Sequence, residues 1–117
     1  MKVIQKLLTT LVILAVLMRT QSTHTAYAAT LIVTKIADTN DGICDSDCSL
    51  REAVTAASGG DTITFDDSIA GGIIALFSQI VLDRDLTLDG SGLNPHVQIS
   101  GTEKTRVFYV NSGITIV

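Results

Sequence analysis

The sequence has no tryptophan, one proline, two cysteines and two histidines in 117 residues. A structural zinc site needs four ligands, and His24 and His96 both lie far from the cysteines. A nucleophilic triad is also missing, because His96, in a turn beside Pro95, is the only histidine after position 28. The glycine-containing segments SGG and GSG lack the lysine or strand–helix context of a phosphate-binding loop. After position 28 the aromatic residues are Phe65, Phe77, Phe108 and Tyr109. They are too few to indicate an aromatic surface that binds carbohydrate.

The first 28 residues have the pattern of an export signal. Lys2 and Lys6 precede a largely apolar run from Leu7 to Met18, and Ala26 and Ala28 form an A-x-A cleavage site. We therefore expect cleavage after Ala28 and a secreted or cell-surface protein. The apolar run is shorter than the about 20 residues of a membrane-spanning helix. An uncleaved anchor is the alternative, and the rest of the chain holds no candidate span.

Basic residues are scarce once this leader is removed. Loss of Lys2, Lys6 and Arg19 takes the basic count from eight to five (8 minus 3) against twelve acidic residues, a net charge of −7. Binding to nucleic-acid phosphates requires a basic surface, so we expect no nucleic-acid partner. An acidic domain is compatible with divalent cations and with solubility outside the cell.

Both cysteines lie in an acidic stretch from Asp38 to Ala57, DTNDGICDSDCSLREAVTAA. Export implies an oxidising compartment, so Cys44 and Cys48 are predicted to form a disulfide. The closed loop is very small, and its stabilisation is about 2 kcal/mol. Metal ligation by the two cysteines is the rival interpretation.

A short helix is predicted directly after the second cysteine. Ser49 to Glu52 reads S-L-R-E, a capping box in which each residue's side chain accepts from the other's backbone N–H. Two turns then present one apolar face, formed by Leu50, Ala53, Val54 and Ala57. So short a helix needs support, and we expect it to cover the end of a strand stack. Arg51, on the opposite face, is either a binding residue or a solvated or ion-paired arginine.

Short apolar strands and glycine turns make up the remainder. Strands are predicted at 30–37, 62–65, 72–76, 79–82, 86–88, 97–100, 106–110 and 114–117. No helical period intervenes after position 61, which excludes doubly wound sheets and leaves an antiparallel sandwich or a parallel β-solenoid. Glycine turns after LTL and QIS, and strand groups repeating at roughly 28 residues, favour the solenoid.

The hexapeptide CSLREA at Cys48 to Ala53 follows an Asp/Asn/Gly-rich run and precedes AVTAASGGDTITF. In these features the chain resembles the N-terminal CSLREA-type domain of secreted bacterial proteins whose bodies are right-handed parallel β-helices. The resemblance covers roughly Thr30 to Val117. It implies a mainly β fold that starts a right-handed parallel β-helix on or outside the cell, and it carries over no catalytic residue.

The expected organisation is a signal peptide (1–28), an N-terminal cap with strand, cysteine loop and helix (29–60), and the first coils of a β-helix (61–117). A solenoid needs about three repeats and capped ends, whereas 61–117 holds about two coils and ends on an apolar strand. We therefore expect the chain to be the front end of a longer protein.

Two acidic clusters are candidate sites. Calcium takes six to eight oxygen ligands, and the acidic stretch offers Asp38, Asn40, Asp41, Asp45 and Asp47. The EF-hand spacing is not met, and a solvated turn is the alternative. Paired carboxylates at Asp83 and Asp85, with Asp89 nearby, are either a glycosidase-like pair or a polar corner that contains Arg84.

The leading functional hypothesis is a non-catalytic capping region of an exported β-helix protein that serves adhesion or another surface interaction. The alternative is the N-terminal part of a β-helix polysaccharide lyase or glycoside hydrolase whose active site lies beyond residue 117. In both cases the partner is an extracellular polysaccharide or a surface, met through later coils.

Overall fold

The computed structural model describes residues 1–8 and 27–117. Residues 2–8 are helical and exposed. Most of the predicted apolar run, Leu7 to Met18, and the Ala26 position of the predicted cleavage site lie outside the described residues. Within the part that is described, no helix has the length and apolar character needed to span a membrane.

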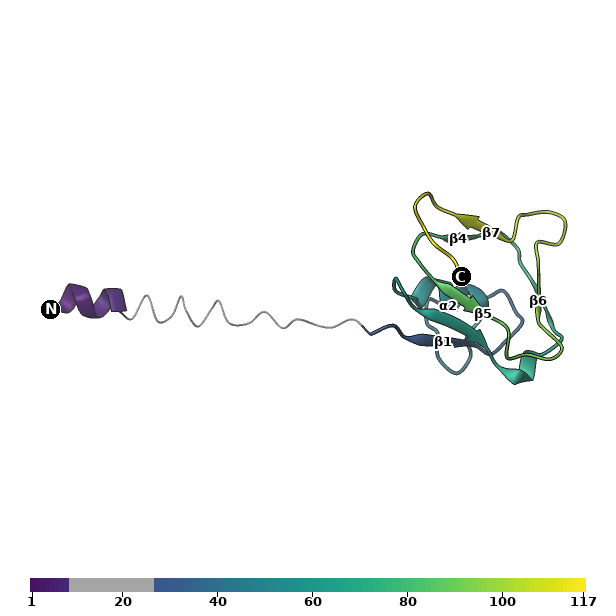
Figure 1. The fold of residues 1–117 in the computed structure, drawn as a ribbon, viewed down its shortest axis with the longest axis horizontal. Coiled ribbons are helices and arrows are strands. Elements are labelled where there is room, and N and C mark those ends of the chain that lie inside the picture. Colours follow the sequence, from purple (N-terminus) through teal and green to yellow (C-terminus); the bar gives the residue numbers. More distant parts are fainter. Residues whose placement is uncertain (9–26) are drawn as a thin grey trace.

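Three small parallel sheets, one α-helix and one 3-10 turn form the body of the protein (Figure 1). The first sheet has the order β1-β2-β5, with bounds Thr30–Val33, Thr62–Phe65 and Thr87–Asp89. The second pairs β3 with β6, and their bounds are Ile73–Ala75 and Gln98–Ser100. The third pairs β4 with β7, and their bounds are Ile80–Leu82 and Phe108–Val110. Helix α2 (Leu50–Ala56) separates β1 from β2, and η1 (Asp67–Ile69) separates β2 from β3.

The chain contributes β2, β3 and β4 to the three sheets in turn, and then contributes β5, β6 and β7 to the same sheets in the same order. Thr62 lies opposite Thr87, and 25 positions also separate Ile73 from Gln98. On the third sheet Ile80 lies opposite Phe108, 28 positions later. All of these pairings are parallel, so the antiparallel sandwich is wrong for the described residues. Figure 1 shows β1 and β5, β6, and the β4–β7 pair on three sides of the body.

Alternation along the strands decides which side chains enter the core. Ile74 is buried while its neighbour Ile73 is half exposed, and Leu82 is buried while Val81 is 44% exposed. This is the two-residue period of a strand with one face turned inward. In β1 the inward residue is Val33, while Ile32 is exposed.

Most of the predicted strands are shorter than expected, and the strands predicted at 30–37 and 114–117 differ most. The strand predicted at 30–37 ends at Val33, because the N–H groups of Thr34 and Lys35 both donate to the carbonyl of Cys48. The strand predicted at 114–117 is reduced to a single bridge between Leu86 and Ile116. The 3-10 turn η1, which Asp66 caps by accepting from the Ser68 N–H, was not predicted.

Helix α2 packs against β1 and β4. All four residues of its predicted apolar face are buried, and they join one cluster with core residues of β1 to β4. We call β2, β3 and β4 the first layer of strands and β5, β6 and β7 the second layer. The helix lies over the first layer and buries its apolar face there, because two isolated turns are unstable in water.

Candidate functional site

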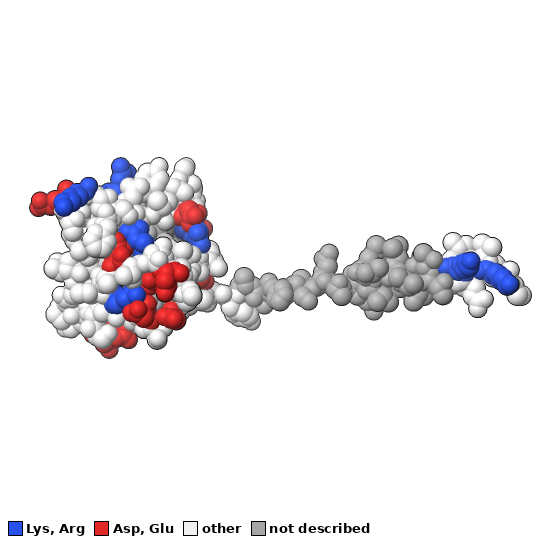
Figure 2. Space-filling view, turned by 180° about the vertical axis from the view of Figure 1, so that it is seen from behind, with Lys and Arg blue, Asp and Glu red and all other residues white. Residues whose placement is uncertain are grey.

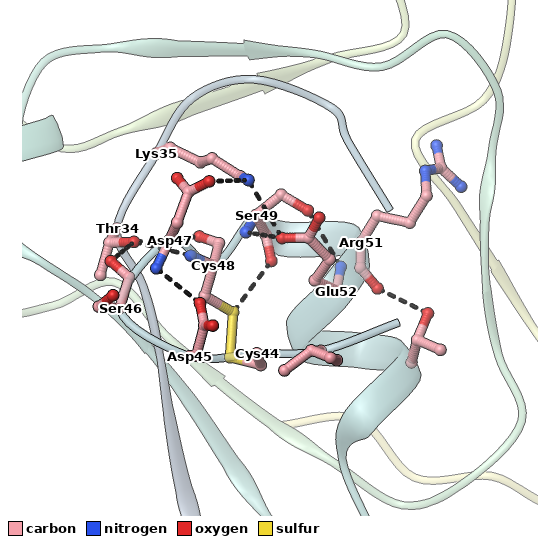
Figure 3. Close-up of a disulfide and its surroundings, with 12 residues drawn as sticks. Thr34, Lys35, Cys44, Asp45, Ser46, Asp47, Cys48, Ser49, Arg51 and Glu52 are labelled. Carbon is pink, nitrogen blue, oxygen red and sulfur yellow. Dashed lines mark hydrogen bonds and ion pairs between the residues drawn. A yellow bond between two sulfur atoms is a disulfide. The ribbon is translucent and has the colours of Figure 1, made fainter. Parts of the chain in front are cut away.

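The cysteine loop is attached to the end of β1. Cys44 and Cys48 are joined in a disulfide with their Cα atoms 4.6 Å apart, so the expected pair is present. The Cys48 N–H donates to Thr34 Oγ1 at 2.9 Å, and the Cys48 carbonyl accepts from the Thr34 N–H at 2.8 Å. The disulfide thus holds a turn that passes directly from a strand edge into α2 (Figure 3).

The start of α2 carries both hydrogen bonds of the capping box. Ser49 Oγ accepts from the Glu52 N–H at 3.0 Å, and the Ser49 N–H donates to Glu52 Oε2 at 2.7 Å. The Ser49 hydroxyl also donates to the Thr39 carbonyl at 2.6 Å. Ser49 therefore joins the helix to the acidic loop as well as capping it.

Glu52 is a buried carboxylate with several donors around it. Its side chain is 1% exposed and accepts from the backbone of Ser49 and Asp41 and from the Thr39 hydroxyl, and Lys35 Nζ lies 3.4 Å away. Burial by itself raises the pKa of Glu52. The donors outweigh burial, led by the Ser49 and Asp41 amides, and lower the pKa to about 2. Glu52 is therefore ionised wherever the protein is folded near neutral pH.

Arg51 makes the second strong connection. Its Nε and Nη2 donate to the two carboxylate oxygens of Asp38 at 2.7 and 2.9 Å, and Nη2 also donates to the Ser78 carbonyl at 2.7 Å. The Phe77 N–H donates to Asp38 Oδ2 at 2.8 Å. The Arg51 hydrogen bonds, with help from Phe77, lower the pKa of Asp38. Arg51 is therefore ion-paired, as one of the two interpretations expected.

Calcium binding and a solvated turn were the two alternatives for the acidic loop, and the structure shows the hydrogen bonds of the turn. The loop's oxygens are used for local turns: Asn40, Asp41 and Asp45 each accept from the backbone N–H two residues ahead. Asp38 is bound to Arg51, and Asp47 pairs with Lys35 at 3.0 Å. Among residues 1–8 and 27–117, no three His, Cys, Asp or Glu side chains converge as a metal site would require.

A groove of about 310 Å³ lies beside α2. Arg51 and Thr55 line it from the helix, and Gln79, Val81 and Arg84 line it from β4 and its flanks. Its volume is at the small end of the range for ligand pockets.

Figure 2 shows basic side chains lying among acidic ones on the face that it displays, consistent with the short ion pairs described above.

The second acidic candidate is a corner of the chain between β4 and β5. Arg84 Nε donates to Asp83 Oδ1 at 2.7 Å, and Arg84 Nη1 donates to the Ala57 carbonyl at 2.6 Å. Asp85 instead accepts from the Thr115 N–H at 2.7 Å. Asp83 and Asp85 therefore have separate structural partners, as the polar-corner reading expects.

The other singled-out residues have simpler positions. His96 is exposed, and Phe65 and Phe108 are half-buried and packed against the core cluster. Phe77 is 88% exposed.

Comparison of the chain with protein-family models, curated proteins and solved structures gave no match.

Sequence reasoning missed two members of this region. Thr39 bonds both Glu52 and Ser49, and Asp61 is a buried carboxylate that accepts from the Ser58 N–H at 2.7 Å. The only local signal for Asp61 was its position after the glycine pair that follows the helix. For Thr39 no local signal exists, because its partners lie 10 and 13 positions away.

Proposed function

We propose that residues 29–117 form the N-terminal cap and the first coils of an exported right-handed parallel β-helix. The observation that carries this proposal is the order of the pairings: β2, β3 and β4 are followed by β5, β6 and β7, each paired in parallel with its counterpart 25 to 28 positions earlier. Connections between parallel strands of one sheet are almost always right-handed, which supports that hand here.

The burial of the core side chains supports a stack of strands with one end covered by α2 and the other end open. Ile63 and Ile74, in the layer under α2, are fully buried. Their partners in the next layer, Leu88 and Ile99, are only half-buried. A further layer of strands stacked on Leu88 and Ile99 would bury them as the first layer is buried.

The backbone has the same asymmetry. The Gln98 N–H donates to the Gly72 carbonyl, and the Ser100 carbonyl accepts from the Leu76 N–H, so both residues bond back to the first layer. Residues of a parallel strand bond alternately to its two sides, which turns the Ile99 amide toward the open side. We infer that this side accepts the next coil.

The proposal also covers the export of the chain and its role outside the cell. The disulfide is consistent with an oxidising compartment, and the leader is the reason to expect one. We propose a non-catalytic role in adhesion or another surface interaction. The alternative is an enzyme acting on polysaccharides whose active site lies on later coils, and it rests on the fold analogy alone.

The test is the sequence encoded beyond Val117 and its effect on the last layer. Strand patterns recurring every 25 to 28 residues are expected there, and in the extended protein the Ile99 amide should exchange hydrogen much more slowly than in residues 1–117. Unchanged exchange at Ile99 would contradict the stacking proposal. Carboxylates recurring on one face of later coils would favour the enzyme, whereas long degenerate repeats ending in a surface anchor would favour the adhesin.

A further inference from the structure

A buried carboxylate holds the residue at which the mature chain is expected to begin. Asp61 is 5% exposed, and its Oδ1 accepts from the Ala29 N–H at 2.8 Å. The Ala29 nitrogen is the atom that cleavage after Ala28 would convert from a peptide amide to an α-amino group. The carboxylate therefore lies within hydrogen-bond distance of a group whose charge depends on processing.

We propose that Asp61 is the receptor for the α-ammonium group produced by cleavage between Ala28 and Ala29, and that the resulting ion pair fastens β1 onto β2. The proposal rests on the proposed export of the chain. In the cleavage, water breaks the peptide C–N bond, giving its hydroxyl to the Ala28 carboxyl group and a hydrogen to the Ala29 nitrogen. The new amine takes up a proton at neutral pH, because an α-amino group has a pKa of about 7.7–8.0.

The position of Ala29 explains how this pair would act on the fold. Ala29 directly precedes β1, and its carbonyl accepts from the Thr62 N–H at 2.9 Å. Asp61 and Thr62 therefore bind the two sides of one residue at the point where the register Thr30 to Thr62 begins. The acceptor of this hydrogen bond is already ionised, and an ammonium donor in place of the neutral amide adds the attraction of two opposite charges.

The surroundings of Asp61 provide an independent argument. Buried carboxylates are normally paired with a cation. Within the described residues, the Asp61 carboxylate has only backbone donors, Ser58 and Ala29, and forms no ion pair with a basic side chain. An α-ammonium group on Ala29 would supply the cation that this site lacks.

The experiment compares two forms of the secreted protein, after mass spectrometry has identified Ala29 as its first residue. One form has a free α-amino group and the other is acetylated there, and each is prepared with and without Asp61→Asn. In the free form we expect the pKa of the amine to lie about one unit above its ordinary range, and Asp61→Asn should return it to that range. Asp66→Asn is the matched control, since Asp66 also accepts from a nearby backbone N–H but has no bond to Ala29.

Stability gives a second measurement. Asp61→Asn should lower the folding equilibrium constant about tenfold more in the free form than in the acetylated form, the ratio that corresponds to one pKa unit. A raised amine pKa stabilises the fold only while the amine is protonated. The advantage of the free form over the acetylated form should therefore be complete below about pH 8 and disappear as the pH rises toward about 10.

Each outcome decides the proposal. A mature chain that begins at a residue other than Ala29 overturns the cleavage after Ala28 and this inference with it. A chain that begins at Ala29 but has an ordinary amine pKa, or one unaffected by Asp61→Asn, overturns the inference alone. If Asp61→Asn prevents folding, the free and acetylated forms of the unsubstituted sequence decide through the pH dependence of their stability difference.

Discussion

Asp38 and Arg51 form a two-bond ion pair that connects three segments of the chain. The Asp38 side chain is 1% exposed and that of Arg51 is 18% exposed. Arg51 belongs to α2 and Asp38 to the acidic loop, while Phe77 and Ser78 from the β3–β4 turn bond to the same two side chains. The pair thus fixes the position of the helix over the first layer of strands.

The first prediction concerns this pair. Arg51→Ala should lower the free energy of unfolding by about 3–5 kcal/mol, because it leaves the Asp38 carboxylate buried without a cation. Arg51→Lys should recover only part of that loss, since a lysine cannot form the two parallel bonds. Chemical denaturation measures both. Arg106→Ala, at an exposed arginine stacked on Tyr109, is the control and should cost less than about 1 kcal/mol. Equal losses for Arg51→Ala and Arg106→Ala would show that the buried pair has no special role.

The second prediction concerns acid sensitivity. The pKa of Glu52 is lowered in the folded state, so its contribution to stability is complete above its unfolded value of about 4.3 and is lost as the pH falls toward about 2. Glu52→Gln should therefore destabilise the protein at pH 7, and the difference from the unsubstituted protein should shrink between about pH 4.5 and 2. Denaturation midpoints over this range test the prediction. A difference that is independent of pH would mean that the Glu52 charge is not stabilised by folding.

The third prediction concerns the helix as a cover for the first layer. Leu50 is fully buried, so Leu50→Ala should cost about 2–5 kcal/mol, and Ser49→Ala should cost about 1 kcal/mol through loss of the cap. Thr55→Ala, on the exposed side of the same helix, is the control and should change stability by no more than about 0.5 kcal/mol. If Leu50→Ala behaves like Thr55→Ala, the helix covers nothing.

The fourth prediction concerns the disulfide. The intact mass of protein purified without reductant should rise by two hydrogens on reduction, and Cys44→Ser should cost about 2 kcal/mol because the closed loop is short. Cys44 is the better site for this substitution, since Cys48 is fully buried and a hydroxyl there would add a second penalty. Two free thiols in exported material would contradict the pairing.

Local sequence signals were sufficient for the elements whose determinants lie within a few residues. The capping box joins Ser49 to Glu52 three positions away, and the buried face of α2 follows from the helical period. Strand 62–65 was located to the residue because Gly59, Gly60 and Asp61 precede it and two aspartates follow it. The two cysteines are four positions apart, so their pairing needed no knowledge of the fold.

Tertiary structure alone decided how those elements are connected. Asp38 was one of several candidate calcium ligands because of its acidic neighbours, and its partners in the structure are Arg51 and, 39 positions away, Phe77. Asp61 and Ala29 meet across 32 positions. Such contacts depend on the path of the intervening chain and on which strands pair, and neither composition nor periodicity encodes that path locally. The sequence by itself determined the helix, the disulfide and the approximate positions of β1 to β7, while only the packed structure determined where the strands end and which charges are buried together, because burial is a property of the whole fold.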